Sequence, residues 1–206
     1  MNALRARVAA SLANERGMTL IEVVIAISIL AVLSTAALGV YLSGINTSAA
    51  LQRRNIAVTV ASQVLERANL VIPSTIYSGR TAVAVEAVRN ANLGVAGLNQ
   101  TFRVSDPTSP PSPTQALPLT STTTLSGTDY TVDTIVGTCF QPRTGGSCTA
   151  PGYPVQPATV PAGMTMLSRV IVVVRWTAGA TCKPTACTYV ASTLVDANPD
   201  LKWNIP

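Results

Sequence analysis

The chain has 206 residues, a length that fits one domain or one domain with an appendage. Apolar residues make up 48% of it and charged residues only 11%, well below the roughly 25% typical of soluble domains. The net charge of +5 is modest and no dense basic stripe is present, so we expect no nucleic-acid partner. Histidine is absent, which removes the commonest general base and metal ligand. We therefore predict a protein that is not an enzyme, with no catalytic residue, no cofactor and no metal site.

The N-terminal region combines a basic leader with a long apolar segment. Residues 1–17 are polar and basic and contain three arginines, Arg5, Arg7 and Arg16. Residues 18–42 carry a single charged side chain, Glu22, and are longer than the about 20 residues needed to cross a hydrocarbon core. Basic residues before such a segment predict that the N-terminus stays in the cytoplasm. We expect a single-pass protein of the cytoplasmic membrane whose remaining residues lie outside.

Two ordinary interpretations of this segment leave its carboxylate unexplained. One is a secretory signal peptide with residues 34–36 as its cleavage site, and the other is a plain signal anchor. A carboxylate inside a membrane segment costs roughly 2.5–3.5 kcal/mol on insertion scales, so such residues are functional by default. Neither a signal peptide nor a plain anchor gains anything from Glu22.

The residues around Glu22 favour a third interpretation. Arg16-Gly17 closes the leader, and Met18-Thr19-Leu20-Ile21-Glu22 opens the apolar run. This arrangement resembles the prepilin signature of type IV pilins and type II secretion pseudopilins, in which a membrane peptidase cuts after the glycine and methylates the new N-terminus. The resemblance implies cleavage between Gly17 and Met18 and N-methylation of Met18. The usual first residue in that family is phenylalanine, and methionine is an accepted departure from it.

Cleavage would give Glu22 a partner. Met18 would then carry a cationic amine at the start of a helix, and Glu22 would lie four residues on, about one turn along the same face. A negative charge near a helix N-terminus is also favourable. The resemblance further implies that, when such helices pack side by side, Glu22 neutralises the amine of a neighbouring subunit.

The helix is expected to continue beyond the membrane segment. No proline occurs from Met1 until Pro73, so a helix from Met18 to about Leu70 would be roughly 80 Å long, and Pro73 would end it. Residues 43–72 are predicted to be its amphipathic half. The apolar positions that recur at helical spacing are Leu42, Ile45, Ala49, Ile56, Val60, Val64 and Leu65. Gly39 and Gly44 fit either close helix packing or a place where the helix bends.

Residues 73–206 are predicted to form a β-rich head, which gives an α+β fold with a long N-terminal helix packed on a small antiparallel sheet. Predicted strands cover residues 101–104, 128–140, 169–177 and 189–195. Residues 170–174 are apolar throughout, so this strand should be covered on both faces, one of them by the helix. Residues 81–95 suggest a short helix or a connection. The proline-rich segments 105–118 and 150–161 are expected to be extended surface loops.

The four cysteines, Cys139, Cys148, Cys182 and Cys187, are an even number in a head expected to be exported, which suggests two disulfides. Of the three pairings we favour the local ones, Cys139 with Cys148 and Cys182 with Cys187, because turn-forming residues such as Pro184 lie between the members of each pair. A four-thiolate zinc site is the alternative, although eight residues separate the first pair and zinc spacings are usually two to four.

The resemblance implies a structural function. Its expected partners are other pilin subunits bound through the N-terminal helix, the prepilin peptidase and methyltransferase, and the assembly machinery of the inner membrane. Residues 57–66 resemble the same part of minor pilins of the PilV kind, and a type II secretion pseudopilin is the alternative. A membrane-anchored binding domain outside the cytoplasm is a rival from another class, and an anchored enzyme is a third. The mature protein would become part of a cell-surface or periplasmic filament.

Overall fold

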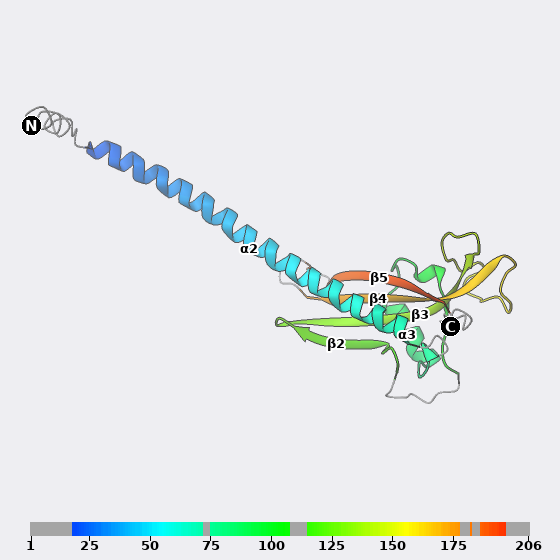
Figure 1. Cartoon of the computed structure of the whole chain (residues 1–206). Helices are drawn as coiled ribbons and strands as arrows, with labels where there is room; N and C mark the ends of the chain where they lie inside the picture. Colours follow the sequence, from blue (N-terminus) through cyan, green and yellow to red (C-terminus); the bar gives the residue numbers. More distant parts are fainter. Residues whose placement is uncertain (1–17, 72–74, 108–114, 178–181, 183–185, 197–206) are drawn as a thin grey trace, which may run out of the picture. The chain divides into compact units, whose positions relative to one another are not determined.

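The computed structural model describes residues 18–71, 75–107, 115–177, 182 and 186–196. The predicted leader 1–17 with Gly17, the helix-ending Pro73 and the turn residue Pro184 lie outside these ranges. The chain divides into two compact units, residues 1–49 and residues 50–206. Helix α2 (Leu20–Leu70) begins in the first unit and ends in the second, as one helix of 51 residues (Figure 1). At 1.5 Å per residue it is about 77 Å long, which agrees with the sequence prediction.

The second unit contains one antiparallel sheet. Its strands are β1 (Phe102–Arg103), β2 (Thr120–Leu125), β3 (Thr128–Pro142), β4 (Met164–Trp176) and β5 (Cys187–Asp196). The order is β1-β3-β4-β5, and β2 pairs with the same strand as β1. The fifteen residues of β3 make this possible, because β2 pairs with its first part and β1 pairs near its end. The predicted α+β fold class is therefore confirmed.

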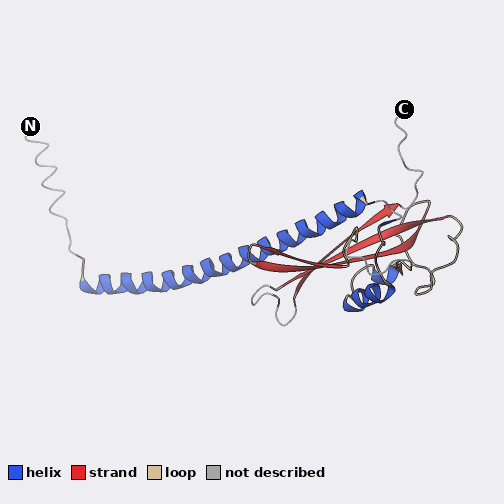
Figure 2. Cartoon of the chain, turned by 90° about the horizontal axis from the view of Figure 1, so that it is seen from below, coloured by secondary structure: helices blue, strands red, loops and turns tan. Residues whose placement is uncertain are grey.

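Strand β4 is central and covered on both faces, as its apolar run predicted. Val170, Val172 and Val174 lie in one core cluster with residues of α2. Ile171 and Val173 lie in a second cluster, on the face that carries the short helix α3 (Ala82–Ala91) and the 3₁₀ turn η2 (Leu98–Gln100). Figure 2 shows the last part of α2 on one side of the sheet and α3 on the other. Alternate side chains of a strand point to opposite faces, and here both faces are buried.

The face of α2 that packs on the sheet contains four of the predicted apolar positions and, in addition, alanines that were not predicted. Ala57, Val60, Ala61 and Ala68 are buried, with Ile56, Val64 and Leu65 partly buried beside them. Leu42 and Ile45 lie in the first unit and are about half exposed. The prediction counted large apolar residues, whereas three of the four buried positions are alanines, which let the helix backbone approach the sheet closely.

Other boundaries were also corrected. Strand β2, a threonine-rich edge strand, was not predicted. A two-residue turn joins it to β3, and both Ser126 and Gly127 have positive φ, as a type I′ hairpin turn requires. Strand β4 begins five residues before its predicted start. The predicted surface loop 105–118 fails at its end, because Leu117 is 1% exposed and belongs to the core cluster on the α2 face. The loop 150–161 is mostly exposed and contains no strand, as expected.

Candidate functional site

The first unit offers an apolar surface. Its large apolar side chains are exposed along the helix; Leu20, for example, is 83% exposed and Val40 is 76% exposed. By length and composition α2 could cross a membrane, and none of its most apolar stretch is buried within the described chain. An ordinary soluble protein does not leave so continuous an apolar surface in water. This surface therefore requires lipid or other protein around it.

The polar hydroxyl groups of this segment find partners within the helix. The hydroxyl of Ser28 donates to the carbonyl oxygen of Val24 at 2.8 Å, and that of Thr35 donates to the carbonyl oxygen of Val32 at 2.8 Å. Such bonds remove the need for water beside the hydroxyl groups, so these side chains are tolerated in an apolar environment. Glu22 differs, because it is the only charged side chain in residues 18–49.

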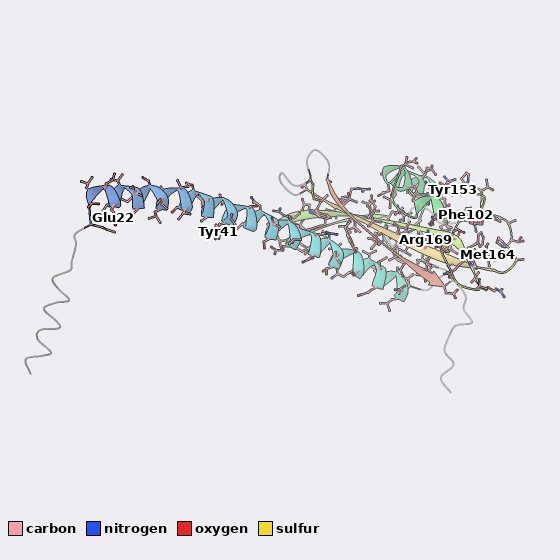
Figure 3. The ribbon with its side chains drawn as sticks, turned by 90° about the horizontal axis from the view of Figure 1, so that it is seen from above. Glu22, Tyr41, Phe102, Tyr153, Met164 and Arg169 are labelled. Carbon is pink, nitrogen blue, oxygen red and sulfur yellow. A yellow bond between two sulfur atoms is a disulfide. The ribbon has the colours of Figure 1, made fainter. Side chains whose placement is uncertain are left out.

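Glu22 lies in the first turn of α2, where Figure 3 labels it. The backbone N–H of Glu22 donates to the carbonyl oxygen of Thr19 at 3.0 Å and faces the Thr19 hydroxyl oxygen at 3.4 Å. Thr19 therefore occupies the N-cap position, and the Thr-x-x-Glu spacing is that of a capping box. The carboxylate is also favourably placed toward the positive end of the helix dipole. Among the described residues no cation forms an ion pair with it.

This capping role was not anticipated from the sequence, although the spacing of Thr19 and Glu22 contained the signal. Glu22 takes part in this cap through its backbone N–H. Met18 precedes the helix and is 69% exposed, so the residue predicted to become the N-terminus is accessible. Gly17 lies outside the described residues, and cleavage after it stays a prediction.

The structure brings the four cysteines together in the local pairs. Cys139 and Cys148 have Cα atoms 5.5 Å apart and sulfur atoms 2.05 Å apart, and Cys182 is paired with Cys187. Beside the first pair, Phe140 and Thr149 exchange two backbone hydrogen bonds of 2.7 and 2.9 Å, so the cysteines close a short hairpin. No group of three or more metal-ligating side chains occurs among the described residues. That both bonds form in the exported protein stays a prediction.

Buried arginines hold the loops of the second unit to the sheet. Arg80 donates to the carbonyl oxygens of Thr134 and Leu117 at 3.0 and 2.8 Å, and burial lowers its pKa to about 10. Arg169 donates to the carbonyl oxygen of Gly97 at 3.2 Å and to that of Cys148, and burial lowers its pKa as well (Figure 3). These roles were not predicted from the sequence, because the residues that flank an arginine do not indicate whether its side chain is buried.

A carboxylate network joins α3 to the sheet. Asp133 accepts hydrogen bonds from Asn92 at 2.9 Å and Thr120 at 2.9 Å, and it forms a 2.6 Å ion pair with Arg175. Burial raises the pKa of Asp133, but these hydrogen bonds and the Arg175 charge outweigh burial and hold it below its usual value. The network stabilises the face of the sheet that carries α3.

A comparison with protein-family models matches one region, residues 12–38, to the family described as "Prokaryotic N-terminal methylation motif". The matched region contains Gly17, Met18 and Glu22 and the first part of α2. Neither the comparison with curated proteins nor that with solved structures gives a match. The motif points to a structural protein that is processed by a prepilin peptidase and assembles with other pilin subunits. Together with the α+β fold and the apolar helix, it supports a type IV pilin-like, prepilin-type protein anchored in a membrane.

Proposed function

We propose that this chain is a minor pilin, a structural subunit of a type IV pilus-like filament. In this proposal residues 1–17 are a cytoplasmic leader, and the prepilin peptidase cuts between Gly17 and Met18 and methylates Met18. Residues 18–42 hold the mature protein in the cytoplasmic membrane, residues 43–72 complete the helix, and residues 73–206 form the head outside. The observation that carries the proposal is a single carboxylate, Glu22, at the start of an otherwise apolar and exposed helix.

The exposed apolar surface supports two successive environments for the same helix. Leaving a Val, Leu or Ile side chain in water costs about 1.5–3 kcal/mol, so the segment is stable only in lipid or against other helices. Moving from lipid into a bundle of helices gains little hydrophobic energy, and close packing must supply the difference. Membrane anchor and assembly interface are therefore the same surface used in turn.

Glu22 supplies specificity to this assembly. A bundle of purely apolar helices has no preferred register, whereas a carboxylate that meets the Met18 amine of the next subunit fixes one. An unpaired charge in an apolar bundle is costly and a paired one much less so, which penalises wrong registers. The capping of α2 by Thr19 keeps Glu22 at a defined place near the N-terminus.

Mass spectrometry of the mature protein tests the processing step. We expect the purified chain to begin at N-methylated Met18. An intact Met1, or a start near Ala37, would overturn the proposal and favour the signal anchor or the signal peptide.

Two substitutions at Glu22 separate charge pairing from local capping. Glu22→Gln keeps the size and the capping ability of the side chain but removes its charge, whereas Glu22→Ala removes both. We expect both variants to be cleaved normally and both to lose at least 90% of their incorporation into filaments, with Ser28→Ala as an unaffected control. If Glu22→Gln assembles normally while Glu22→Ala does not, the carboxylate acts as a cap and the pairing mechanism is wrong.

The rival assignments predict different phenotypes. A type II secretion pseudopilin shares the processing site and the helix, but deleting it would stop protein secretion and leave pili intact. An anchored binding domain would tolerate Glu22→Ala without any loss of filaments. For a minor pilin we expect deletion to reduce the number of surface filaments while secretion continues.

A further inference from the structure

The head contains a pocket that the assembly function does not use. It lies between α3, η2, β1 and the loop around Tyr153, and has a volume of about 390 Å³. That volume lies within the range of small-molecule sites. Its polar lining comes mainly from Glu86, Arg89, Asn90, Asn99, Arg103 and Tyr153. Figure 3 shows Tyr153 beside the short helix that carries Arg89.

Arg89 is a buried cation with unused hydrogen-bonding capacity. Only 5% of the residue is exposed. Its Nη2 donates to the carbonyl oxygens of Leu98 and Thr101 at 3.1 and 3.0 Å and lies 3.3 Å from the hydroxyl oxygen of Tyr153. Its Nη1 is buried without a hydrogen-bond partner among the described residues. Such unsatisfied donors are rare in folded proteins, and each one requires an explanation.

The charges around the pocket do not balance. Arg103 forms an ion pair with Glu86 at the pocket wall, with side chains 54% and 45% exposed. Arg89 has no carboxylate partner among the described residues, because its contacts are carbonyl oxygens and the Tyr153 hydroxyl. Two guanidinium groups therefore line a pocket that contains one carboxylate, which leaves a net charge of +1. A single negative charge would complete it.

The remaining lining indicates what that negative charge belongs to. The exposed amides of Asn90 and Asn99 each offer a donor and an acceptor, which matches hydroxyl groups that also do both. Tyr153 and Leu93 add flat or apolar surface. A phosphate or sulfate is less suitable, because it is often doubly charged, whereas the lining has a surplus of only one positive charge. A planar carboxylate fits the fork of a guanidinium group.

We propose that this pocket binds a carboxylate-bearing sugar, such as a hexuronate, with the carboxylate toward Arg89 and Arg103 and the hydroxyl groups toward Asn90 and Asn99. In this arrangement Glu86 competes with the ligand for Arg103. The inference does not depend on processing at Gly17, since every residue involved lies in the second unit. It would make the head a receptor for acidic saccharides.

The test is a binding titration of the full chain in detergent with sodium glucuronate, by isothermal calorimetry or by NMR. We expect saturable binding, with glucose and acetate each at least tenfold weaker, because each carries only half of the recognised groups. Equal binding of acetate and glucuronate, or no binding of glucuronate, would overturn the proposal.

Three variants make the test specific without touching the buried Arg89. Arg103→Gln should weaken glucuronate binding at least fivefold, whereas Glu86→Gln should strengthen it two- to fivefold because it frees Arg103 and removes a negative charge. Arg143→Gln makes the same charge change at an exposed arginine elsewhere and should leave the affinity within twofold. A loss of affinity in Glu86→Gln, or an equal loss in Arg143→Gln and Arg103→Gln, would refute the assigned site.

Discussion

The contact between α2 and the sheet depends on small side chains, and Ala61→Leu tests it. Ala61 has no exposed surface and lies in the cluster that includes Val170, Val172 and Trp176. Leucine adds three carbon atoms at a position where none fits, while its helix propensity is close to that of alanine. Overpacking of a closed core costs about 1–3 kcal/mol. For a unit of this size we therefore expect the melting temperature to fall by about 2–12 °C.

The neighbouring residue supplies a matched control. Ser62 lies on the exposed side of the same helix, so Ser62→Leu adds the same side chain away from the sheet. We expect it to change stability by less than about 0.5 kcal/mol. Thermal unfolding of the full chain in detergent can be followed by the fluorescence of Trp176, which is buried in the affected cluster. Trp203→Phe removes the other tryptophan and leaves a single reporter.

The comparison between the two leucine variants decides the outcome. If Ala61→Leu melts within 1 °C of the parent, the helix has room at this position and the close approach is wrong. Equal shifts in Ala61→Leu and Ser62→Leu would point to an effect of leucine on the helix itself rather than on its contact with the sheet.

Three further predictions concern the second unit. Gly137→Ala would place a Cβ atom 2.1 Å from the carbonyl oxygen of Phe102, so β1 must move; we expect a loss of about 1–3 kcal/mol in urea unfolding. Because the pKa of Asp133 is lower in the folded than in the unfolded protein, its ionised form stabilises the fold at pH values above the unfolded-state pKa of about 3.9. This stabilisation is lost as the pH falls through the lower pKa of the folded state. Asp133→Asn should therefore be less stable at pH 7 and show a flatter acid limb in pH-dependent melting. Replacing Cys139 and Cys148 by serine should cost about 2.7 kcal/mol in chemical unfolding, the chain-entropy value for a loop of about ten residues.

Much of the fold could be predicted because hydrophobic patterns survive in a single sequence. The uninterrupted apolar segment and the absence of proline before position 73 predicted one long helix, and the structure has it from Leu20 to Leu70. Five consecutive β-branched residues, 170–174, predicted a strand buried on both faces, and β4 is that strand. Both predictions depend on local composition rather than on how distant segments meet.

The misses share a physical cause. Alanine gives a weak signal, so Ala57 and Ala61 were overlooked although they form the contact between α2 and the sheet. Arginine normally indicates solvent exposure. No sequence pattern predicted that Arg80 and Arg89 would be buried, with their guanidinium groups donating hydrogen bonds to backbone carbonyl oxygens. The pocket beside Arg89 could not be predicted either. It forms where α3, a 3₁₀ turn and a loop distant in the sequence come together.

The two parts of α2 illustrate how one helix can serve two kinds of environment. Its first part carries Leu, Ile and Val side chains that are all exposed among the described residues, such as Ile21 at 63% and Val32 at 68%. Its last part places small residues at the buried positions, where the chain's own sheet covers them. A segment that must fit lipid first and other helices later gains from an apolar surface all around it, whereas a segment with one fixed neighbour needs only one fitted face. Under the proposed function, the exposed part of α2 meets lipid and other helices, whereas the part that contains Ala57 and Ala61 is fitted to the chain's own sheet.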